Sequence, residues 1–414
     1  GKDAKSQDWV GVVNGGLSST PFGEGLEATT DREDAMFTQT VEAATGKLHG
    51  FAPKFKMRDG VKPTGESARF HIRAAMGMGT VFAAPLWHSG FWVTLKAPPE
   101  AALLELYRQI TAEKISLGRA TYGFMYSNGT AYTSRIMLDF IVDHLYESSL
   151  TLSDKDDIRN YIRVPDLQIL IWAMANATWP NGFQYQRSCI ADPEKCKHVI
   201  EEKLNLGKLL WTDTNALTES QVKHMTKRQR GSVSLEDVKR YTDEFVRGQD
   251  RKIQITDELS MILKVPTVVE HIEASYRWIN TIEEMYARVL TQDDRARDEY
   301  LLNQGKATAM RQYTHFVKAV LVGEHEYDEV STIEDTLNDL TSRDDVRAKF
   351  LEKAREYLDN SVISLVATPT FKCPKCGGEQ TGEAHKHHPE LIPLDVMQTF
   401  FQLLVQRLRK IEDR

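Results

Sequence analysis

The four cysteines of this chain lie in two pairs, and this arrangement constrains the fold more than any other feature. Cys189 and Cys196 form the first pair, and Cys373 and Cys376 form the second. An aromatic segment precedes each pair, and a short leucine-containing stretch follows it. Two hairpins that each supply two thiolates can close one tetrahedral zinc site. The sequence therefore predicts a structural zinc that fastens two segments lying far apart in the chain.

The second pair has the stronger local signature. The run from Cys373 to Cys376 reads Cys-Pro-Lys-Cys and is followed by two glycines, which accept the positive φ that a zinc knuckle needs. Cys189 and Cys196 are spaced more widely than is usual for such a turn. Three downstream histidines are alternative ligands to the first pair: His385, His387 and His388. A four-cysteine site, a local site of Cys373, Cys376 and two histidines, and metal-free thiols are the three interpretations.

Whichever ligands are used, the pattern indicates a structural metal. A catalytic zinc keeps an open position and usually takes histidine or carboxylate ligands. The chain has no His-Glu-x-x-His motif and no His-x-Glu with a downstream Pro-Cys-x-x-Cys. We expect zinc to act here by contributing folding energy.

The composition is typical of a soluble globular protein. The 414 residues are 41% hydrophobic and 27% charged, with a formal net charge of −7. A negative net charge gives no overall reason to expect nucleic acid or an anionic membrane as a partner of the chain. No apolar run has the length of a membrane span, and the polar N-terminus shows no signal pattern. The scarcity of cysteine and the expected zinc site indicate that the chain folds in a cytoplasm.

The pattern of elements predicts a mainly α protein with small β elements, an α+β fold with a helical-bundle core. Residues 1–97 are expected to form an extended, β-rich arm with a small sheet, and residues 98–250 a helical core with the first cysteine hairpin. Residues 251–360 are expected to form long helices, and residues 361–414 the second zinc knuckle and a C-terminal helix.

Particular patterns support this division. Alternation predicts strands over 69–73 and 90–96, and residues 362–366 are a further strand candidate. Apolar side chains at Tyr313, Phe316, Val320 and Leu321 suggest a helix stripe. The last helix has a heptad seam, which predicts packing on the chain's own core or on another chain. Its members are Met397, Phe401, Leu404, Leu408 and Ile411.

No catalytic motif is present. The sequence lacks a Gly-x-Ser-x-Gly elbow, a Walker A loop and a dinucleotide fingerprint. His144 and His315 have apolar neighbours and are expected to be core histidines with satisfied hydrogen bonds. A basic helical stretch near residues 217–230 is either a nucleic-acid patch or a solvated helix face; it carries Lys223, His224, Lys227, Arg228 and Arg230. These observations predict that the protein is not an enzyme.

The segment from Pro165 to Phe245 resembles the baseplate hub and hub-assembly-chaperone-like family of contractile-tailed, T-even-type bacteriophages. The similarity lies in the order of parts: a helix, the aromatic turn Trp179–Phe183, a cysteine pair, a leucine-rich stretch, a helical stretch and a late Cys-x-x-Cys. The resemblance implies a non-enzymatic structural component of a tail baseplate, in the hub or the wedge. It further implies partners among other virion tail proteins, several copies in a symmetric assembly, and a place in the virion tail after assembly in the host cytoplasm.

Two other functions compete with this expectation. One is a nucleic-acid-associated zinc-binding protein, which would bind DNA with a steep dependence on salt. The other is a hydrolase with an unrecognised active site, which would place a strongly perturbed carboxylate or histidine in a cleft.

Overall fold

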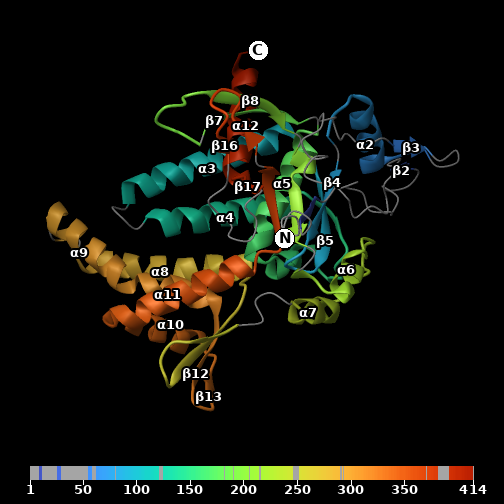
Figure 1. Ribbon diagram of the computed structural model, residues 1–414. Coiled ribbons are helices and arrows are strands. Elements are labelled where there is room, and N and C mark those ends of the chain that lie inside the picture. The colour runs from blue at the N-terminus through green and yellow to red at the C-terminus, as the bar shows by residue number, and fades with distance from the viewer. Residues whose placement is uncertain are drawn as a thin grey trace.

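The chain has a mixed α+β architecture, about 55% helix and about 20% strand, which confirms the predicted class in its coarse form. The computed structural model (Figure 1) describes residues 9–11, 26–28, 55–57, 62–79, 81–120, 125–180, 182–189, 191–204, 206–213, 216–245, 251–289, 291, 293–369, 371–380 and 391–413.

Helix α5 (Val164–Thr178) is the centre of the main core. It is apolar nearly all round, so it can be buried on every side, and Trp172 at its middle is completely buried. One face packs against the antiparallel pair β4 (Val81–Leu86) and β5 (Phe91–Lys96), where the rings of Phe82 and Trp172 meet edge to face with centroids 5.1 Å apart. Sheets as well as helices therefore cover α5.

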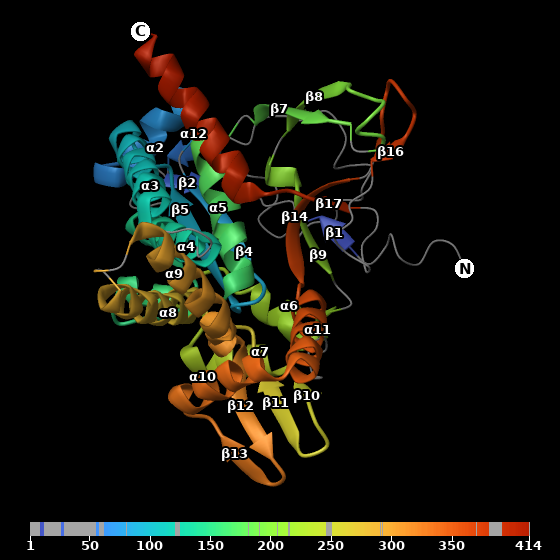
Figure 2. The same cartoon turned by 90° about the vertical axis from the view of Figure 1, so that its left-hand side faces the viewer.

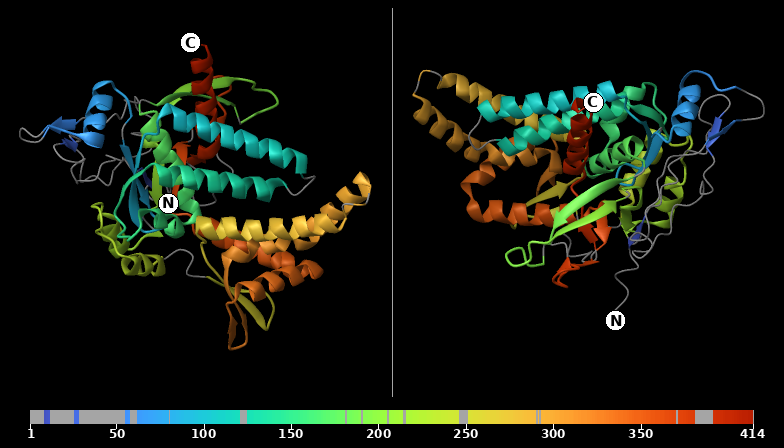
Figure 3. Two further views of the ribbon diagram at one scale, coloured as in Figure 1. Left: turned by 180° about the vertical axis from the view of Figure 1, so that it is seen from behind. Right: turned by 90° about the horizontal axis from the view of Figure 1, so that it is seen from above.

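A layer of helices lies beside this centre. α3 (Glu100–Ala120) contacts α4 (Met125–Asp143), α4 contacts α8 (Val268–Arg288), and α8 contacts α9 (Asp294–Thr308). Figure 1 shows α3, α4 and α8 stacked one below the other, and the view from behind in Figure 3 shows the same order. β6 (Leu145–Ser148) follows α4 and completes the sheet β4-β5-β6.

A second sheet joins segments that are far apart in the chain. Its order is β1-β9-β14-β17, made by β1 (Trp9–Gly11), β9 (Leu210–Asp213), β14 (Ser364–Pro369) and β17 (Leu391–Pro393). β9 and β14 are antiparallel, with Leu365 opposite Trp211. The Trp211 indole N–H donates to the Ala367 carbonyl at 2.8 Å, so this sheet links the middle of the chain to its C-terminal part.

A separate lobe follows residue 251, and the sequence did not predict its sheet. Four strands form the antiparallel order β10-β11-β12-β13. They are β10 (Lys252–Gln254), β11 (Leu259–Leu263), β12 (Val317–Val322) and β13 (His325–Tyr327). Met261, Leu337 and Phe350 lie in the buried core that this sheet shares with α10 (Val330–Asp339) and α11 (Asp344–Asn360). The lobe is the lower part of Figure 1.

The local predictions have mixed outcomes. The strands predicted at 90–96 and 362–366 correspond to β5 and β14, whereas residues 69–73 lie within helix α2 (Gly65–Ala75), so that strand prediction was wrong. The stripe over 313–321 was also wrong as a helix, because it runs from the 3₁₀ segment η4 (Ala309–Phe316) into β12. The largest core cluster draws residues from 82 to 404, and the predicted domain boundaries themselves stay a prediction.

Shorter elements connect these parts. They are β2 (Leu26–Ala28), β3 (Phe55–Met57), η1 (Lys155–Tyr161), β7 (Phe183–Ser188), β8 (Val199–Leu204), η2 (Leu206–Lys208), α6 (Glu219–Met225), α7 (Leu235–Asp243), η5 (Leu340–Ser342), β15 (Phe371–Lys372) and β16 (Glu379–Gln380). None of the described helices combines the length and the apolar character that crossing a bilayer requires.

The C-terminal helix α12 (Val396–Glu412) packs on its own chain through its first half. Phe400 and Leu404 are completely buried, and the helix contacts α5 and α3. The Arg407 guanidinium forms a bidentate ion pair with the Glu100 carboxylate, with the shortest N–O distance at 2.7 Å. Beyond it the helix extends away from the body in Figure 2. Pairing of this end with another chain stays a prediction.

Candidate metal centre

The first cysteine pair sits in the loop end of a β-hairpin. β7 and β8 pair antiparallel from Phe183 opposite Leu204 to Ser188 opposite Val199, and Cys189 follows β7 directly. The Cys189 N–H donates to the His198 carbonyl at 3.0 Å, which extends the ladder by one residue. The Cys196 N–H donates to the Asp192 carbonyl at 2.8 Å, so a tight turn brings Cys196 back toward Cys189. This turn explains how the wide spacing is accommodated.

The second pair lies in a tight turn between two short strands. The strands β15 and β16 flank it, with Lys372 opposite Glu379. The Gly377 N–H donates to the Cys373 carbonyl at 2.9 Å, and Gly377 has a φ of 70°, the left-handed conformation that glycine allows. The Gly378 N–H points at the Cys376 sulfur, 3.4 Å away, as expected for a thiolate ligand.

The two hairpins bring all four sulfurs together. The Sγ atoms of Cys189 and Cys376 are 3.7 Å apart, those of Cys196 and Cys373 are 3.9 Å apart, and all four lie within 4.8 Å of one another. Four sulfurs placed about 2.3 Å from one tetrahedral ion would be about 3.8 Å apart. The spacing is far too long for a disulfide bond between these sulfurs. The donor set and its spacing therefore fit a tetrahedral metal ion.

The two hairpins also pack directly on each other. Gly378 lies so close to the first cysteine loop that an added Cβ would be 2.6 Å from the Cβ of Ala191. Cys189, Cys196 and Cys373 are buried in a small cluster of their own, whereas Cys376 is exposed. Figure 2 shows β16 beside the loop end of the β7–β8 hairpin. One side of the four-sulfur cluster thus faces solvent.

The electrostatics of the cluster favour a cation. The Gly378 N–H lowers the pKa of the Cys376 thiol, but burial and the sulfurs of Cys189, Cys373 and Cys196 raise it, to about 12 in total. Four sulfurs this close cannot all carry negative charge without a counter-charge. A bound divalent cation reverses the balance, because it stabilises coordinating thiolates outright.

The histidine alternative concerns residues that the structure leaves undescribed. His385, His387 and His388 fall in the segment 381–390, outside the described residues. The four predicted cysteines, Cys189, Cys196, Cys373 and Cys376, come together without them.

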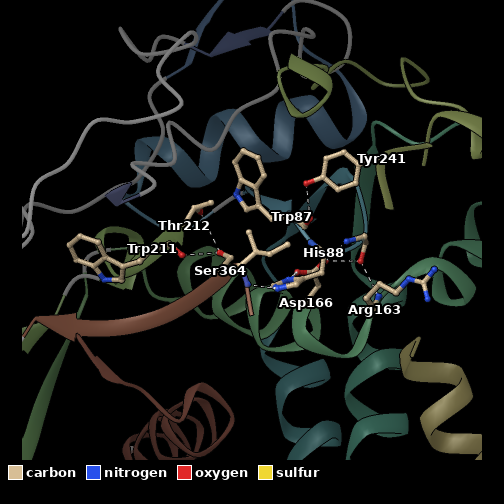
Figure 4. Close-up of polar contacts among 10 residues, drawn as sticks. Trp87, His88, Arg163, Asp166, Trp211, Thr212, Tyr241 and Ser364 are labelled. Carbon is tan, nitrogen blue, oxygen red and sulfur yellow. Dashed lines mark hydrogen bonds and ion pairs between the residues drawn. The ribbon is translucent and has the colours of Figure 1, made fainter. Parts of the chain in front are cut away.

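A second polar site, which the sequence did not reveal, lies in the main core (Figure 4). The Asp166 carboxylate is completely buried in the first turn of α5. It accepts four hydrogen bonds, from the backbone N–H groups of His88 and Ser89 at 3.1 and 2.8 Å, from the Ser89 hydroxyl at 2.6 Å, and from His88 Nδ1 at 2.7 Å. The Ser89 hydroxyl also accepts from the Arg163 N–H at 2.9 Å, so it caps the start of the helix.

The other side of the His88 ring fixes its role. Ile363 donates its N–H to His88 Nε2 at 2.9 Å, so Nε2 must be the acceptor and Nδ1 carries the proton. The serine contacts the carboxylate and not the imidazole, so this trio lacks the nucleophile-to-base contact of a hydrolytic triad. The network connects the turn after β4, the start of α5 and the residue before β14. Its geometry is that of a structural junction.

The basic stretch around α6 is largely engaged within the chain. Lys223 pairs with Glu219 at 3.0 Å, His224 Nε2 donates to the Gly90 carbonyl at 2.6 Å, and the Arg228 guanidinium lies over the Trp92 ring at 4.5 Å. Cations that are already paired or stacked contribute little to a nucleic-acid surface. These contacts favour the solvated-face interpretation.

The two predicted core histidines behave differently. His144 Nδ1 donates to the Phe140 carbonyl at 2.7 Å. His315 is buried, and its Nε2 contacts His271 Nδ1 at 2.9 Å, while its own Nδ1 is buried without a partner among the described residues. Burial, together with His271, Lys264 and Arg277, lowers the pKa of His315 to about 3. His315 is therefore a neutral core histidine at physiological pH, but not a fully satisfied one.

Comparison of the chain with models of protein families, with curated proteins and with solved structures gives no match. The resemblance to phage baseplate proteins therefore rests on the quoted residues alone.

Proposed function

We propose that this chain is a non-enzymatic structural component of a phage tail baseplate, in the hub or the wedge, and that one structural zinc clamps its two cysteine hairpins. The observation that carries the proposal is the four-sulfur cluster. Four thiolates fill a tetrahedral shell and leave no open position for a substrate or an activated water. Such a site serves folding and shape rather than reaction.

Zinc is favoured over other metals by the donor set. Tetrahedral sulfur ligation suits zinc, with iron as the other common occupant, whereas hard cations require oxygen ligands. The knuckle turn, in which an N–H points at Cys376 Sγ, supplies the outer contact typical of thiolate sites. Metal analysis separates the two occupants directly.

The baseplate part of the proposal is supported by the sequence resemblance and by the shape of the zinc site. The two hairpins stand out from the helical body in Figure 2, so they are suited to contact with a neighbouring subunit. Several copies in a symmetric assembly would each present the same surface. The nucleic-acid alternative is disfavoured because Lys223 of α6 and Arg228, which follows that helix, already have partners within the chain.

Metal content of the purified full chain tests the zinc site. We expect one zinc per chain by mass spectrometry, and thiolate charge-transfer bands after replacement by cobalt. Cys376→Ser should lose most of the metal. Lys375→Ala, an exposed position between two ligands, is the matched control and should retain it. Full zinc content with an unchanged cobalt spectrum in Cys376→Ser would show that the cluster is not the site.

The baseplate role requires a separate test. Mass spectrometry of purified tails and of baseplate assembly intermediates should detect the chain in fixed proportion to known tail proteins. Its absence from all of these particles, or a measured catalytic turnover that depends on the chain, would contradict the assignment even if zinc is present.

A further inference from the structure

A basic hollow of about 360 Å³ lies where the main body meets the lobe formed after residue 251. Its walls come from the start of α5, the end of α7, the residue before β10, the two residues after β11, β12, the start of α8 and the end of α11. Five cations line it: Arg163, Lys239, Arg251, Lys264 and Lys318. Asp243 and Glu270 are the carboxylates among the described lining residues. In a chain of net charge −7, this local excess of positive charge does not follow from composition.

One of the two carboxylates already has partners within the chain. Glu270 forms an ion pair with Lys264 and accepts from the N-cap residue Thr267 in the capping box of α8. Asp243 is exposed at the end of α7. The positive charges of the two arginines are therefore not balanced by the acids of the hollow.

Arg163 is the most constrained of these cations. Its backbone is held as the N-cap residue of α5, and its Nη1 donates to the Val265 carbonyl at 2.7 Å. Among the described residues no carboxylate forms an ion pair with it. Burial lowers the pKa of Arg163, with Glu270 acting in the opposite direction. A guanidinium has five N–H donors, and a desolvated one is normally paired with an anion.

Arg251 faces the same hollow from β10's side. Its Nη2 donates to the Thr242 carbonyl at 3.2 Å, and no described carboxylate pairs with it. Tyr357, a buried residue of α11, lies close enough for both arginines to lower its pKa against the larger effect of burial. The two guanidinium groups and the tyrosine therefore occupy one region. In Figure 4 the Arg163 side chain points away from the Asp166 network, so its guanidinium does not pair with the Asp166 carboxylate.

We propose that this hollow binds a small phosphate-bearing molecule, held by the guanidinium groups of Arg163 and Arg251. Guanidinium groups match phosphate oxygens in paired hydrogen bonds. The volume falls in the range of small-molecule sites, and Phe245 and Tyr357 add aromatic wall. The site is separate from the cysteine cluster and independent of the proposed zinc.

A second hollow of about 380 Å³ shares Tyr357 as a wall and extends the positive surface. It is lined by Lys252, Lys349 and Lys353, with Glu356 paired to Lys353 at 3.4 Å. The positive field thus continues along α11 and β10, which increases the local concentration of an anionic ligand at the mouth of the arginine site.

Calorimetric titration at constant ionic strength tests the proposal, with inorganic phosphate and adenosine monophosphate as probes. We expect saturable binding at one site per chain. Arg251→Gln and Arg163→Gln should each weaken it by about 10- to 100-fold, the effect of losing one charge-assisted contact. Arg251→Lys should give an intermediate loss because the charge remains while the fork is lost. Arg108→Gln is the control, since Arg108 is an exposed, paired cation on α3.

Arg163→Gln also removes a contact to Val265, so its folding is checked by urea denaturation, and Arg251→Gln serves as the second variant. The proposal is overturned if neither probe shows saturable binding, or if Arg251→Gln and Arg108→Gln have the same affinity. It is equally overturned if a single-stranded oligonucleotide alone binds, with a steep salt dependence, because the hollow would then be part of a nucleic-acid surface. Zinc content is measured in parallel and should be unchanged in every variant.

Discussion

Replacing His88 by alanine should destabilise the folded chain strongly, although His88 lies far from the cysteine cluster. The ring is almost wholly buried and makes two directed hydrogen bonds. Nδ1 donates to the Asp166 carboxylate at 2.7 Å, and Nε2 accepts from the Ile363 N–H at 2.9 Å. Alanine removes both hydrogen bonds at once. Because the core is packed, water cannot enter to replace them without a further loss of packing.

The magnitude follows from these two contacts. A hydrogen bond to a charged group contributes about 1.5–3 kcal/mol, and a buried N–H left without a partner costs about 1–3 kcal/mol. Their sum, about 2.5–6 kcal/mol, brackets the cost of about 3–5 kcal/mol for removing one partner from a buried charged pair. That is a large fraction of a typical unfolding free energy of about 5–15 kcal/mol. His88→Asn should lose about half, because its amide can replace Nδ1 but does not reach Ile363.

Urea denaturation monitored by tryptophan fluorescence measures the loss. His325→Ala, an exposed histidine on β13, is the matched control and should change the unfolding free energy by less than about 0.5 kcal/mol. The double variant His88→Ala/Asp166→Ala should cost less than the sum of the single variants, because the buried charge is gone with its donor. A loss below about 1 kcal/mol in His88→Ala would refute the junction role.

Three further predictions concern other parts of the chain. Gly378→Ala should weaken metal binding, because its Cβ would press on Ala191 at 2.6 Å, whereas Gly377→Ala meets no neighbour and should cost only about 1 kcal/mol from its positive φ; metal titration compares them. Leu404→Asp should lower the melting temperature of the isolated chain, since Leu404 is completely buried. The pKa of His315 is lowered to about 3, so its neutral form is stabilised by folding. Stability should therefore fall as pH drops below about 6.5, by up to about 1.4 kcal/mol per pH unit, and His315→Gln should reduce this slope in acid titrations of unfolding.

The sequence was most informative where chemistry is local. The Cys-Pro-Lys-Cys run with its two glycines predicts a knuckle because the turn, its positive φ and the sulfur-directed N–H all arise within six residues. Pairing with Cys189 and Cys196 was also predictable, since thiol pairs are scarce in this chain and a tetrahedral site needs four ligands. The apolar circumference of α5 likewise indicated a buried helix.

The lobe sheet could not be predicted from periodicity. β10 and β13 have three residues each, too few to establish an alternation. The spacing of apolar residues across 313–321 imitated a helix stripe because a 3₁₀ segment ends and a strand begins within it. Local propensity was overridden by pairing with β11, a segment more than fifty residues upstream.

The Asp166 network was hidden for a different reason. Its partners are 78 and 275 residues apart along the chain, and none belongs to a motif. Asp166 read as an ordinary first-turn acid of a helix, where a carboxylate is favourable anyway. Only the packing of the β4–β5 turn against the helix start makes it a buried charge with four donors. The hollow that contains Arg163 and Arg251 could not be predicted either, because its walls come from both the main body and the lobe formed after residue 251.

The sheet beneath the cysteine cluster changes what a metal would do there. Cys196 and Cys373 are 177 residues apart in sequence, which suggests a staple across a very long loop. However, β9 and β14 already pair, with Leu210 opposite Val366, and the two cysteine segments leave the same end of that pair. The loop that the metal closes beyond the sheet is only about 20 residues, so the closure entropy at stake is smaller by about 2 kcal/mol than for the full separation. The main effect of a metal would be on the relative position of the two hairpins. Without it, the β7–β8 hairpin and the turn at Cys373 would separate, while the sheet stays paired and the main core stays packed. A zinc in this place therefore fixes the direction of a projecting double hairpin more than it holds the chain together, which is what a contact surface in a symmetric assembly requires.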